Sequence, residues 1–404
     1  MKILMLSVTF PYPPSRGGTE VRTFNLLKAL QQEHDVTLFA LRYGGLPETD
    51  IQELKEWVTE LQVFPVPSNE YDRSLLGKAS RFGRFLLDGT PASTRHRQTA
   101  EIQAWIDHQA QSQQFDAITC EHSANEVFVS PTVQAHIPRR IVDIHSSVYG
   151  TCKQQLATGT AANPLRERIS LAFLKRYETR YCGKFTDLVV TTPEDADQIH
   201  TLRPDRPVHV VTNGVDLAEF SLRSHDPSGY DLVFVGAMDT PPNIDAAIYF
   251  SREVFPLIRA QYPDATLYLV GTRPKPSVLA LGDIPGVVVT GKVPSTTDYL
   301  HKATVCVVPL RSGYGIKNKT LEAMAAGIPV VASDRGLEGL QVEGPNVPQR
   351  ALRANTPQEY VTAISQLFAN SGLRQALSQN ARTMIEADYT WESAGKVYSS
   401  ILSR

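Results

Sequence analysis

Lys317 and Lys319 stand at the start of a short predicted helix in the segment RSGYGIKNKTLEAMAAGIPVV, residues 311–331. The positive end of a helix dipole disfavours cations by about 0.3–1 kcal/mol each, so two lysines there need an explanation. Gly313 and Gly315 precede them and would let a ligand approach the backbone closely. Glycines, open backbone amides and lysines together predict a site for an anion such as a phosphate.

The helix that follows is predicted from the spacing of its apolar residues over 319–326. Its apolar face comprises Leu321, Met324, Ala325 and Ile328. Asn318 is a suitable N-cap, and Gly327 is a normal C-terminal stop.

Glu322 follows Lys319 by three residues, so both side chains share one face of this helix. A carboxylate there can accept hydrogen bonds from hydroxyl groups, and phosphates next to a hydroxylated ribose make up a nucleoside diphosphate. In the alternative interpretation the two residues form a solvated i,i+3 pair worth about 0.2–0.5 kcal/mol. That pair leaves Lys317 and both glycines unexplained, and we therefore predict a nucleotide site.

A second glycine-containing turn follows the first predicted strand of the chain. The segment SVTFPYPPSRGGTEV places Gly17 and Gly18 before a helix whose expected N-cap is Thr19. Such a helix start leaves backbone N–H groups open to a phosphate. The alternative is that the two glycines only supply positive φ angles to the turn.

Four further candidates lie at or near the ends of predicted strands. His145 ends IVDIH and offers chemistry near neutral pH, whereas His122, at the end of DAITCEH, has an equivalent position. Asn213 turns out of the strand 208–212, where it either contacts a ligand or only caps the backbone of a hinge turn. Gly236 follows a buried strand and permits a close backbone approach. The alternative for each histidine is a structural hydrogen bond.

The composition is that of an ordinary globular protein with no bias toward nucleic acid. The 404 residues contain 40 Lys and Arg against 42 Asp and Glu, and the isoelectric point is about 6.6. The four cysteines are far apart without metal-ligand spacing, which favours a reduced, cytoplasmic setting. The N-terminus lacks the pattern of a signal peptide, and no stretch approaches the roughly 18–20 apolar residues of a membrane span.

Short apolar runs alternate with helical segments along the whole chain, which predicts an α/β fold with parallel sheets. The predicted strands of the first half are 2–8, 35–41, 116–121, 139–145, 187–192 and 208–212. Those of the second half are 231–238, 265–272, 286–293, 304–310 and 329–333. Helices expected between them include 20–30, 98–114, 164–182, 244–260, 357–369 and 374–387. The alternation restarts after a polar, turn-rich stretch, so we expect two Rossmann-like doubly wound domains with a ligand cleft between them.

Several motifs in this order resemble glycosyltransferase family 4, the retaining nucleotide-sugar enzymes of the GT-B fold. The motifs are PYPPSRGGTEVRTFNLLKAL, TNGVD, FVGAMD…PPN, GIKNKTLEAMAAGIPVVAS and the C-terminal YTWESAGKVYSSIL. The likeness spans nearly the full chain and is nearest to the bacterial exopolysaccharide sugar transferases. It implies an N-terminal acceptor-binding domain at 1–212, a linker at 213–230 and a C-terminal nucleotide-sugar-binding domain at 231–388. A terminal helix in 389–404 would cross back to the first domain.

Some of the family's functional residues have a counterpart in this sequence, and others are replaced or missing. Glu322 matches the second of the family's two glutamates, which binds ribose, whereas Tyr314 stands in place of the first. The Arg and Lys that members carry soon after the strand matching 231–238 are missing here, so Lys317 and Lys319 would supply that charge. His145 matches a family histidine near the transferred sugar.

We therefore expect an enzyme that moves a sugar from a nucleotide-diphosphate donor to a hydroxyl acceptor with retention. No DxD motif follows a strand, so neither a metal nor a cofactor is expected, and no pair of carboxylates is placed for a double displacement. Front-face attack, in which the donor phosphate takes the acceptor proton, suits such a site. The alternatives are a nucleotide-sugar epimerase and a non-enzymatic two-domain sugar-binding protein.

A basic amphipathic segment at 71–97 carries six Lys or Arg against two Asp. Its predicted helical face contains Leu75, Ala79, Phe82 and Leu86. This face either packs against its own domain, the interpretation we favour, or rests peripherally on anionic lipid at the inner membrane face.

Overall fold

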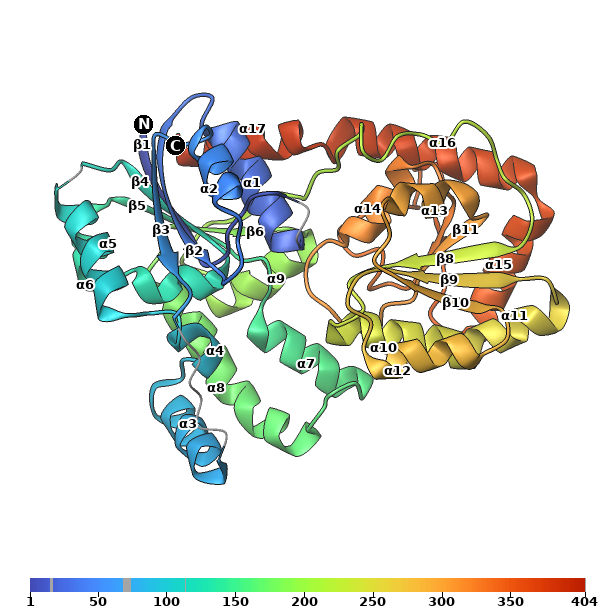
Figure 1. The fold of residues 1–404 in the computed structure, drawn as a ribbon, viewed down its shortest axis with the longest axis horizontal. Helices are drawn as coiled ribbons and strands as arrows, with labels where there is room; N and C mark the ends of the chain where they lie inside the picture. The colour runs from blue at the N-terminus through green and yellow to red at the C-terminus, as the bar shows by residue number, and fades with distance from the viewer. Residues whose placement is uncertain (15–16, 68–73, 113, 404) are drawn as a thin grey trace. The chain divides into compact units, whose positions relative to one another are not determined.

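The computed structural model describes residues 1–14, 17–67, 74–112 and 114–403. The chain forms two compact units, one of Met1–Thr212 with Ala394–Arg404 and the other of Asn213–Ser393 (Figure 1). Each unit is an α/β structure built on one sheet, and each is described separately below.

The sheet of the first unit has seven strands in the order β3-β2-β1-β4-β5-β6-β7, and all neighbouring strands are parallel. The strands are β1 (Lys2–Ser7), β2 (Asp35–Arg42), β3 (Glu60–Pro65), β4 (Ala117–Glu121), β5 (Arg139–Asp143), β6 (Asp187–Val190) and β7 (Val208–Val210). The strand order runs outward in opposite directions from β1 and β4. In open parallel sheets, ligands bind outside the carboxyl ends of the strands at such a switch point.

The helices of the first unit connect these strands. They are α1 (Gly18–Leu30), α2 (Glu48–Lys55), α3 (Leu75–Asp88), α4 (Ala92–Arg95), α5 (Ala100–Ser112), the 3₁₀ helix η1 (Ser123–Phe128), α6 (Pro131–His136), α7 (Val148–Thr158), α8 (Pro164–Cys182) and α9 (Pro193–Leu202). The last helix, α17 (Trp391–Leu402), belongs to this unit from Ala394 onward. A Cβ atom on Gly395 would lie 2.3 Å from Cβ of Ala29, so α17 packs closely on α1 at this glycine.

The sheet of the second unit has six parallel strands in the order β10-β9-β8-β11-β12-β13. The strands are β8 (Asp231–Val235), β9 (Thr266–Val270), β10 (Val287–Gly291), β11 (Val305–Val308), β12 (Val330–Ala332) and β13 (Leu352–Arg353). The helices are α10 (Pro241–Tyr249), the π-helix η2 (Phe250–Val254), α11 (Phe255–Gln261), α12 (Pro276–Leu279), the 3₁₀ helix η3 (Ala280–Asp283), α13 (Thr296–Lys302), α14 (Asn318–Ala325), α15 (Pro357–Ala369) and α16 (Ser371–Asp388). Helices cover both faces of this sheet (Figure 1).

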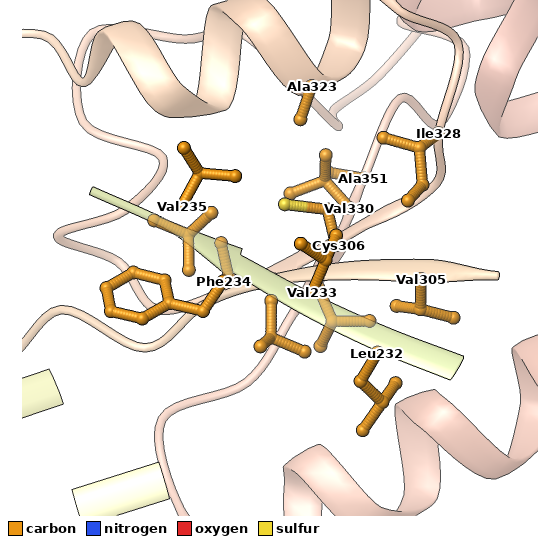
Figure 2. Close-up of a cluster of buried hydrophobic side chains, with 14 of the residues drawn as sticks. Leu232, Val233, Phe234, Val235, Val305, Cys306, Ala323, Ile328, Val330 and Ala351 are labelled. Atoms are coloured by element: carbon orange, nitrogen blue, oxygen red, sulfur yellow. The ribbon is translucent and has the colours of Figure 1, made fainter. Parts of the chain in front are cut away.

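The core of the second unit lies between its central strands and the helices (Figure 2). Leu232, Val233 and Phe234 of β8 are completely buried, as are Ala323 of α14 and Val330 of β12. Strands covered on both faces are apolar without alternation, and these strands follow that pattern. The predicted class, two doubly wound parallel-sheet units, is therefore confirmed.

Two strands and one helix differ from the prediction. The sequence of β3, ELQVFP, mixes polar with apolar residues, and β13 has only two residues, so neither edge strand gives a clear apolar run. The expected helix 244–260 is divided into α10, η2 and α11. Pro256 has no N–H to donate, and the π-turn before it accommodates the missing hydrogen bond.

The segment 213–230, expected as a linker, is packed within the second unit. The amide of Val215 donates to the carbonyl of Tyr389 at 2.9 Å. A Cβ atom on Gly214 would lie 2.1 Å from the backbone nitrogen of Trp391, so only glycine fits there.

Helix α3 lies within the amphipathic segment expected at 71–97. Residues 71–73 and the side chains of Leu75, Ala79 and Leu86 lie outside the described part of the structure. Phe85 packs against Phe173 of α8 with ring centroids 5.9 Å apart. In the described part of the chain, no helix combines the length and the apolar character needed to cross a bilayer.

Candidate active site

The carboxyl ends of β4 and β5 bring two acidic residues and two histidines together in the first unit. Glu121 and Asp143 end these neighbouring strands and are register partners. The rings of His122 and His145 follow them, with centroids 5.5 Å apart in an edge-to-face arrangement. Two strand-end histidines distant in sequence are therefore neighbours in the fold.

His145 is held by Asp143, which is itself held by a buried arginine. Nε2 of His145 lies 2.9 Å from Oδ2 of Asp143. The Arg22 guanidinium on α1 donates to both carboxylate oxygens, from Nε at 2.6 Å and Nη2 at 3.0 Å. Arg22 also donates to the carbonyl of Thr212 at 3.1 Å. This double contact fixes the carboxylate, and the carboxylate orients the imidazole.

The charge of this group follows from its partners. Burial opposes ionisation of Asp143, but Arg22 and His145 outweigh it and hold the pKa of this carboxyl below its usual range. The carboxylate therefore accepts a hydrogen bond from Nε2–H of His145, and Nδ1 is the ring nitrogen left for a ligand. A histidine oriented in this way can donate to, or accept from, a sugar hydroxyl.

Glu121 is kept neutral beside this group. Burial and the charge of Asp143 raise its pKa to about 8, although the hydroxyl of Tyr398 on α17 donates to Oε1 at 2.7 Å. The structure thus brings two carboxyl groups together where no such pair was expected from the sequence. One is protonated and the other is bound by Arg22, so neither is available as a nucleophile.

Glu121, Asp143 and His145 also have a spacing that could hold a metal ion, because one ligand atom of each lies within 4.8 Å of the others. However, Arg22 already binds both oxygens of Asp143. Its guanidinium supplies the positive charge that a metal would bring, so these residues do not favour a metal site.

His122 has a mainly structural environment. Its backbone has a φ angle of 95°, and Nδ1 accepts a hydrogen bond from the amide of Ala124 at 3.0 Å. Burial and the neighbouring His145 lower its pKa to about 3, so the ring is neutral. Nε2 lies 3.4 Å from Oγ of Ser146. The alternative of a structural hydrogen-bonding role fits His122, whereas His145 presents its second nitrogen.

The glycine turn at the start of α1 differs in detail from the prediction. Gly17, not Thr19, is the N-cap, and the helix begins at Gly18. The φ angle of Gly17 is −179°, which any residue can adopt, and Gly18 is not a positive-φ glycine. The alternative that these glycines only supply positive φ is therefore wrong. A Cβ atom on Gly17 would lie 2.8 Å from Oε2 of Glu20, and the described helix start is crowded there by this side chain.

In the second unit, Gly236, Asn243 and Lys319 meet beyond the end of β8. The amine of Lys319 donates to Oδ1 of Asn243 and lies 4.7 Å from the ring centroid of Phe234. A Cβ atom on Gly236 would be 2.7 Å from both this amine and Nδ2 of Asn243. Helix α14 therefore places a lysine amine beyond the end of β8.

The electrostatics of Lys319 and Glu322 reflect their burial. Burial lowers the pKa of Lys319 to about 7 and raises the pKa of Glu322 to about 7. Within the described residues, these two side chains form no ion pair with each other. The alternative of a solvated surface pair is therefore wrong. An anion brought to Lys319 would restore its positive charge.

Lys317 is engaged differently from Lys319. It is the N-cap residue of α14, whereas the predicted N-cap was Asn318. Its buried amine lies 3.1 Å from Oε2 of Glu338 and also donates to the carbonyl of Gly315. The Asn318 side chain instead accepts from Nδ2 of Asn213 at 2.6 Å. Asn213 and Lys317 thus both anchor the start of α14.

The loop before α14 lies against the first turns of α10. Gly313 and Gly315 have φ angles of 130° and 73°, a conformation that glycine adopts without strain. A Cβ atom on Gly313 would be 3.9 Å from Cβ of Pro242. Arg311 pairs with Asp245 of α10, with Nε 2.9 Å from Oδ2. Gly236, Gly313 and Lys319 are predicted site residues of the second unit. All three lie next to the first turn of α10, and we call this group the Lys319 site.

Gly236→Ala tests whether the Lys319 site binds a ligand through its lysine. The new Cβ atom would lie 2.7 Å from both the Lys319 amine and Nδ2 of Asn243 and would displace these groups, so we expect nucleoside diphosphate affinity to fall by about 1 kcal/mol. Calorimetric titration measures this loss, with Gly282→Ala as a matched control because a Cβ atom there would meet only Cγ2 of Val289, at an ordinary contact distance of 4.0 Å. Unchanged affinity in Gly236→Ala would show that the position of Lys319 does not matter for binding.

Comparison with known proteins identifies the family. A sequence model described as glycosyltransferase family 4 matches residues 16–219, which is half of the chain. A second, described as glycosyl transferases group 1, matches residues 229–370. The chain belongs to glycosyltransferase family 4. The predicted family is confirmed, and the group at His145 and the group at Lys319 lie within the two matched regions.

Similar proteins include a sequence relative and two solved structures. An uncharacterized 44.6 kDa protein in the cps region of Klebsiella pneumoniae is 21% identical over 415 residues, which covers 99% of this chain and 98% of that protein. Sucrose-phosphate synthase from Thermosynechococcus elongatus has a TM-score of 0.71 at 17% identity, covering 100% of this chain and 99% of that one. HepE of Anabaena, solved with UDP and glucose, has a TM-score of 0.65 at 14% identity with the same coverage. These structures show that this family 4 chain has their fold.

Arg22, Asp143, Glu121 and Tyr398 were not predicted as site residues. Arg22 and Asp143 are 121 positions apart, and Tyr398 is 277 positions from Glu121. The sequence does contain one signal that points to Glu121 and Asp143. A glutamate and an aspartate end the short strands AITCE and RRIVD directly after apolar residues, and a buried carboxyl group requires a partner.

Proposed function

We propose that the chain transfers a sugar from a nucleoside-diphosphate donor to a hydroxyl acceptor with retention of anomeric configuration. The observation that carries the proposal is the half-buried Lys319 amine beside Gly236 and Asn243. A cation whose pKa is lowered by burial gains most from an anionic ligand, because that ligand restores its charge in a poorly solvated place.

In this proposal the second unit binds the donor. Lys319 and the backbone amides at the start of α14 stabilise the diphosphate, and Glu322 accepts hydrogen bonds from the ribose hydroxyls. Lys317 contributes indirectly, because its amine is paired with Glu338 at the base of the same helix. Gly313 and Gly315 allow the phosphates to approach the loop, and Asn213 holds the helix start through Asn318.

The first unit then serves the acceptor and the reacting carbon. Nδ1 of His145 hydrogen-bonds a hydroxyl of the transferred sugar, and the amides of Gly17 and Gly18 contribute to stabilising the leaving diphosphate. The two carboxyl groups nearby are protonated or bound by Arg22, so a covalent intermediate on either is not proposed. Front-face attack, in which the donor phosphate accepts the acceptor proton, requires neither of these two carboxyl groups.

Two of the similar proteins support this assignment. HepE of Anabaena was solved with UDP and glucose, which are the parts of a nucleotide sugar. The Klebsiella protein belongs to a cps region, and we propose exopolysaccharide assembly as the setting of the reaction.

A thermal-shift screen against UDP, GDP, ADP and CMP and their sugar conjugates tests the donor assignment. At one hundred times its dissociation constant, a ligand stabilises the folded state by about 2.7 kcal/mol, or about 5–10 °C for a unit of this size. We expect one nucleoside diphosphate to produce such a shift, while its parent nucleoside produces less. No shift with any member would contradict the proposal.

A further inference from the structure

A large cavity lies within the first unit, between α3, α7 and α8. Its volume is about 1120 Å³, somewhat above the roughly 300–1,000 Å³ of common ligand pockets. The lining is mainly apolar and includes Phe82, Phe85, Val148, Cys152 and Leu174. None of the residues assigned above to the donor lines this cavity.

Aromatic rings form the α3 side of the cavity. Phe82 and Phe85 lie with ring centroids 6.2 Å apart, and Phe85 continues to Phe173 of α8 at 5.9 Å. The guanidinium of Arg166 lies 5.5 Å from the centroid of Phe82. The wall is thus apolar along its length, with a cation from α8 above one ring.

One part of the cavity wall adjoins the group that holds His145. Ser146 lines the cavity and follows His145 directly in sequence. Oγ of Ser146 lies 3.4 Å from Nε2 of His122, whose ring packs edge-to-face against that of His145. A molecule in the cavity would therefore have one end close to the proposed reaction centre.

The outer surfaces of the same helices carry unusually exposed apolar residues. Leu76 and Leu87 of α3 are 83% and 84% exposed, and Leu165 of α8 is 74% exposed. Ile169 of α8 is also exposed. Exposed apolar side chains are thus present on two of the helices that line the cavity, where an amphipathic molecule can meet them.

We propose that this cavity binds the hydrocarbon chain of an amphipathic, lipid-type acceptor whose hydroxylated head lies at Ser146 and His145. The chemistry of binding follows from the apolar lining and the volume, and the guanidinium of Arg166 suits an anionic group on such a molecule. The role of the head as acceptor rests on the proposed function, whereas binding of the chain does not.

A series of octyl, decyl and dodecyl phosphate, each below its micelle concentration, tests the proposal without any nucleotide. Burying one methylene group strengthens binding about fourfold, so calorimetry should show about a fifteenfold gain for each two-carbon step. Farnesyl phosphate, with a main chain as long as dodecyl, distinguishes an isoprenoid chain from a linear one. If farnesyl phosphate binds more tightly than dodecyl phosphate, the preferred chain is an isoprenoid, and if dodecyl phosphate binds more tightly, it is a linear chain. Either result supports the proposal.

Variants that fill the cavity provide the controls. Thr151→Trp on α7 and Ser170→Trp on α8 place an indole among the lining residues and should remove the chain-length dependence. Lys153→Trp, exposed on α7 and outside the lining, should retain it. Thermal unfolding checks that each variant is folded. Because one cavity variant lies on α7 and the other on α8, the test remains possible if one of them fails to fold.

Equal affinity of the protein for octyl, decyl and dodecyl phosphate would overturn the proposal. So would a gain in affinity per two-carbon step that is the same in both cavity variants as in the unchanged protein. The proposal would also be overturned if the unchanged protein were a dimer without chain-length dependence and Thr151→Trp dissociated that dimer. The cavity would then bind a second copy of the chain. Failure of the nucleotide screen with a retained chain-length effect would instead remove only the transferase assignment.

Discussion

Replacing His145 with alanine should lower turnover at least about tenfold and leave nucleoside diphosphate affinity nearly unchanged. The ring is held by Asp143 at 2.9 Å, and Asp143 is fixed by Arg22, so Nδ1 has a defined direction. A contact near the reacting carbon acts mainly in the transition state, which lowers turnover rather than donor binding. Steady-state kinetics and calorimetry on the same preparation measure the two quantities.

His122→Ala is the matched control for this prediction. His122 neighbours His145, but its Nδ1 caps the amide of Ala124 and its ring is neutral. We expect its loss to reduce stability more than turnover. If turnover were unaffected in His145→Ala, or fell equally in both variants, His145 would be a structural residue.

Replacing Lys319 with alanine should weaken binding of a nucleoside diphosphate by about 1–3 kcal/mol, the scale of a hydrogen bond to a charged group. Binding of the nucleoside without phosphates should change little. Glu322→Gln should weaken both ligands, because it removes a charged acceptor for the ribose. Equal losses for both ligands in Lys319→Ala would contradict the assignment of the phosphates to this lysine.

The same lysine gives binding a pH dependence. Burial lowers the pKa of Lys319 to about 7, so the free amine becomes neutral as the pH rises through 7. A bound diphosphate favours the protonated amine, and the lysine's contribution to affinity should therefore decrease between pH 6.5 and 8.5. Lys319→Ala should lack this contribution. Because burial also raises the pKa of Glu322 to about 7, the comparison is repeated in a Glu322→Gln background.

Lys317 shows where sequence reasoning reached its limit. Two lysines at a helix start are unusual in any sequence, but only the fold separates their environments. Lys317 pairs with Glu338, 21 positions away, whereas Lys319 reaches Asn243 and Phe234, 76 or more positions away. No local pattern encodes such partners, because they depend on which strands and loops the sheet brings together.

The architecture was more predictable than the site, for a physical reason. Continuous apolar strands such as β8 and β11 are readable because burial on both faces imposes their composition. The strand-end positions of His145 and Gly236 follow from that reading. The hydrogen bonds of Arg22 and Tyr398 do not, since both residues lie on helices whose sequences show only which face is apolar.

Transfer itself is tested most directly by incubating the protein with the donor selected in the thermal screen, labelled with ¹³C at the anomeric carbon. Nuclear magnetic resonance then follows the label with donor alone and with an amphipathic hydroxyl acceptor. We predict that the donor sugar keeps its identity without acceptor, and that with acceptor a product forms with the anomeric configuration of the donor. Conversion of the sugar to its epimer with donor alone, or a product of inverted configuration, would contradict the account.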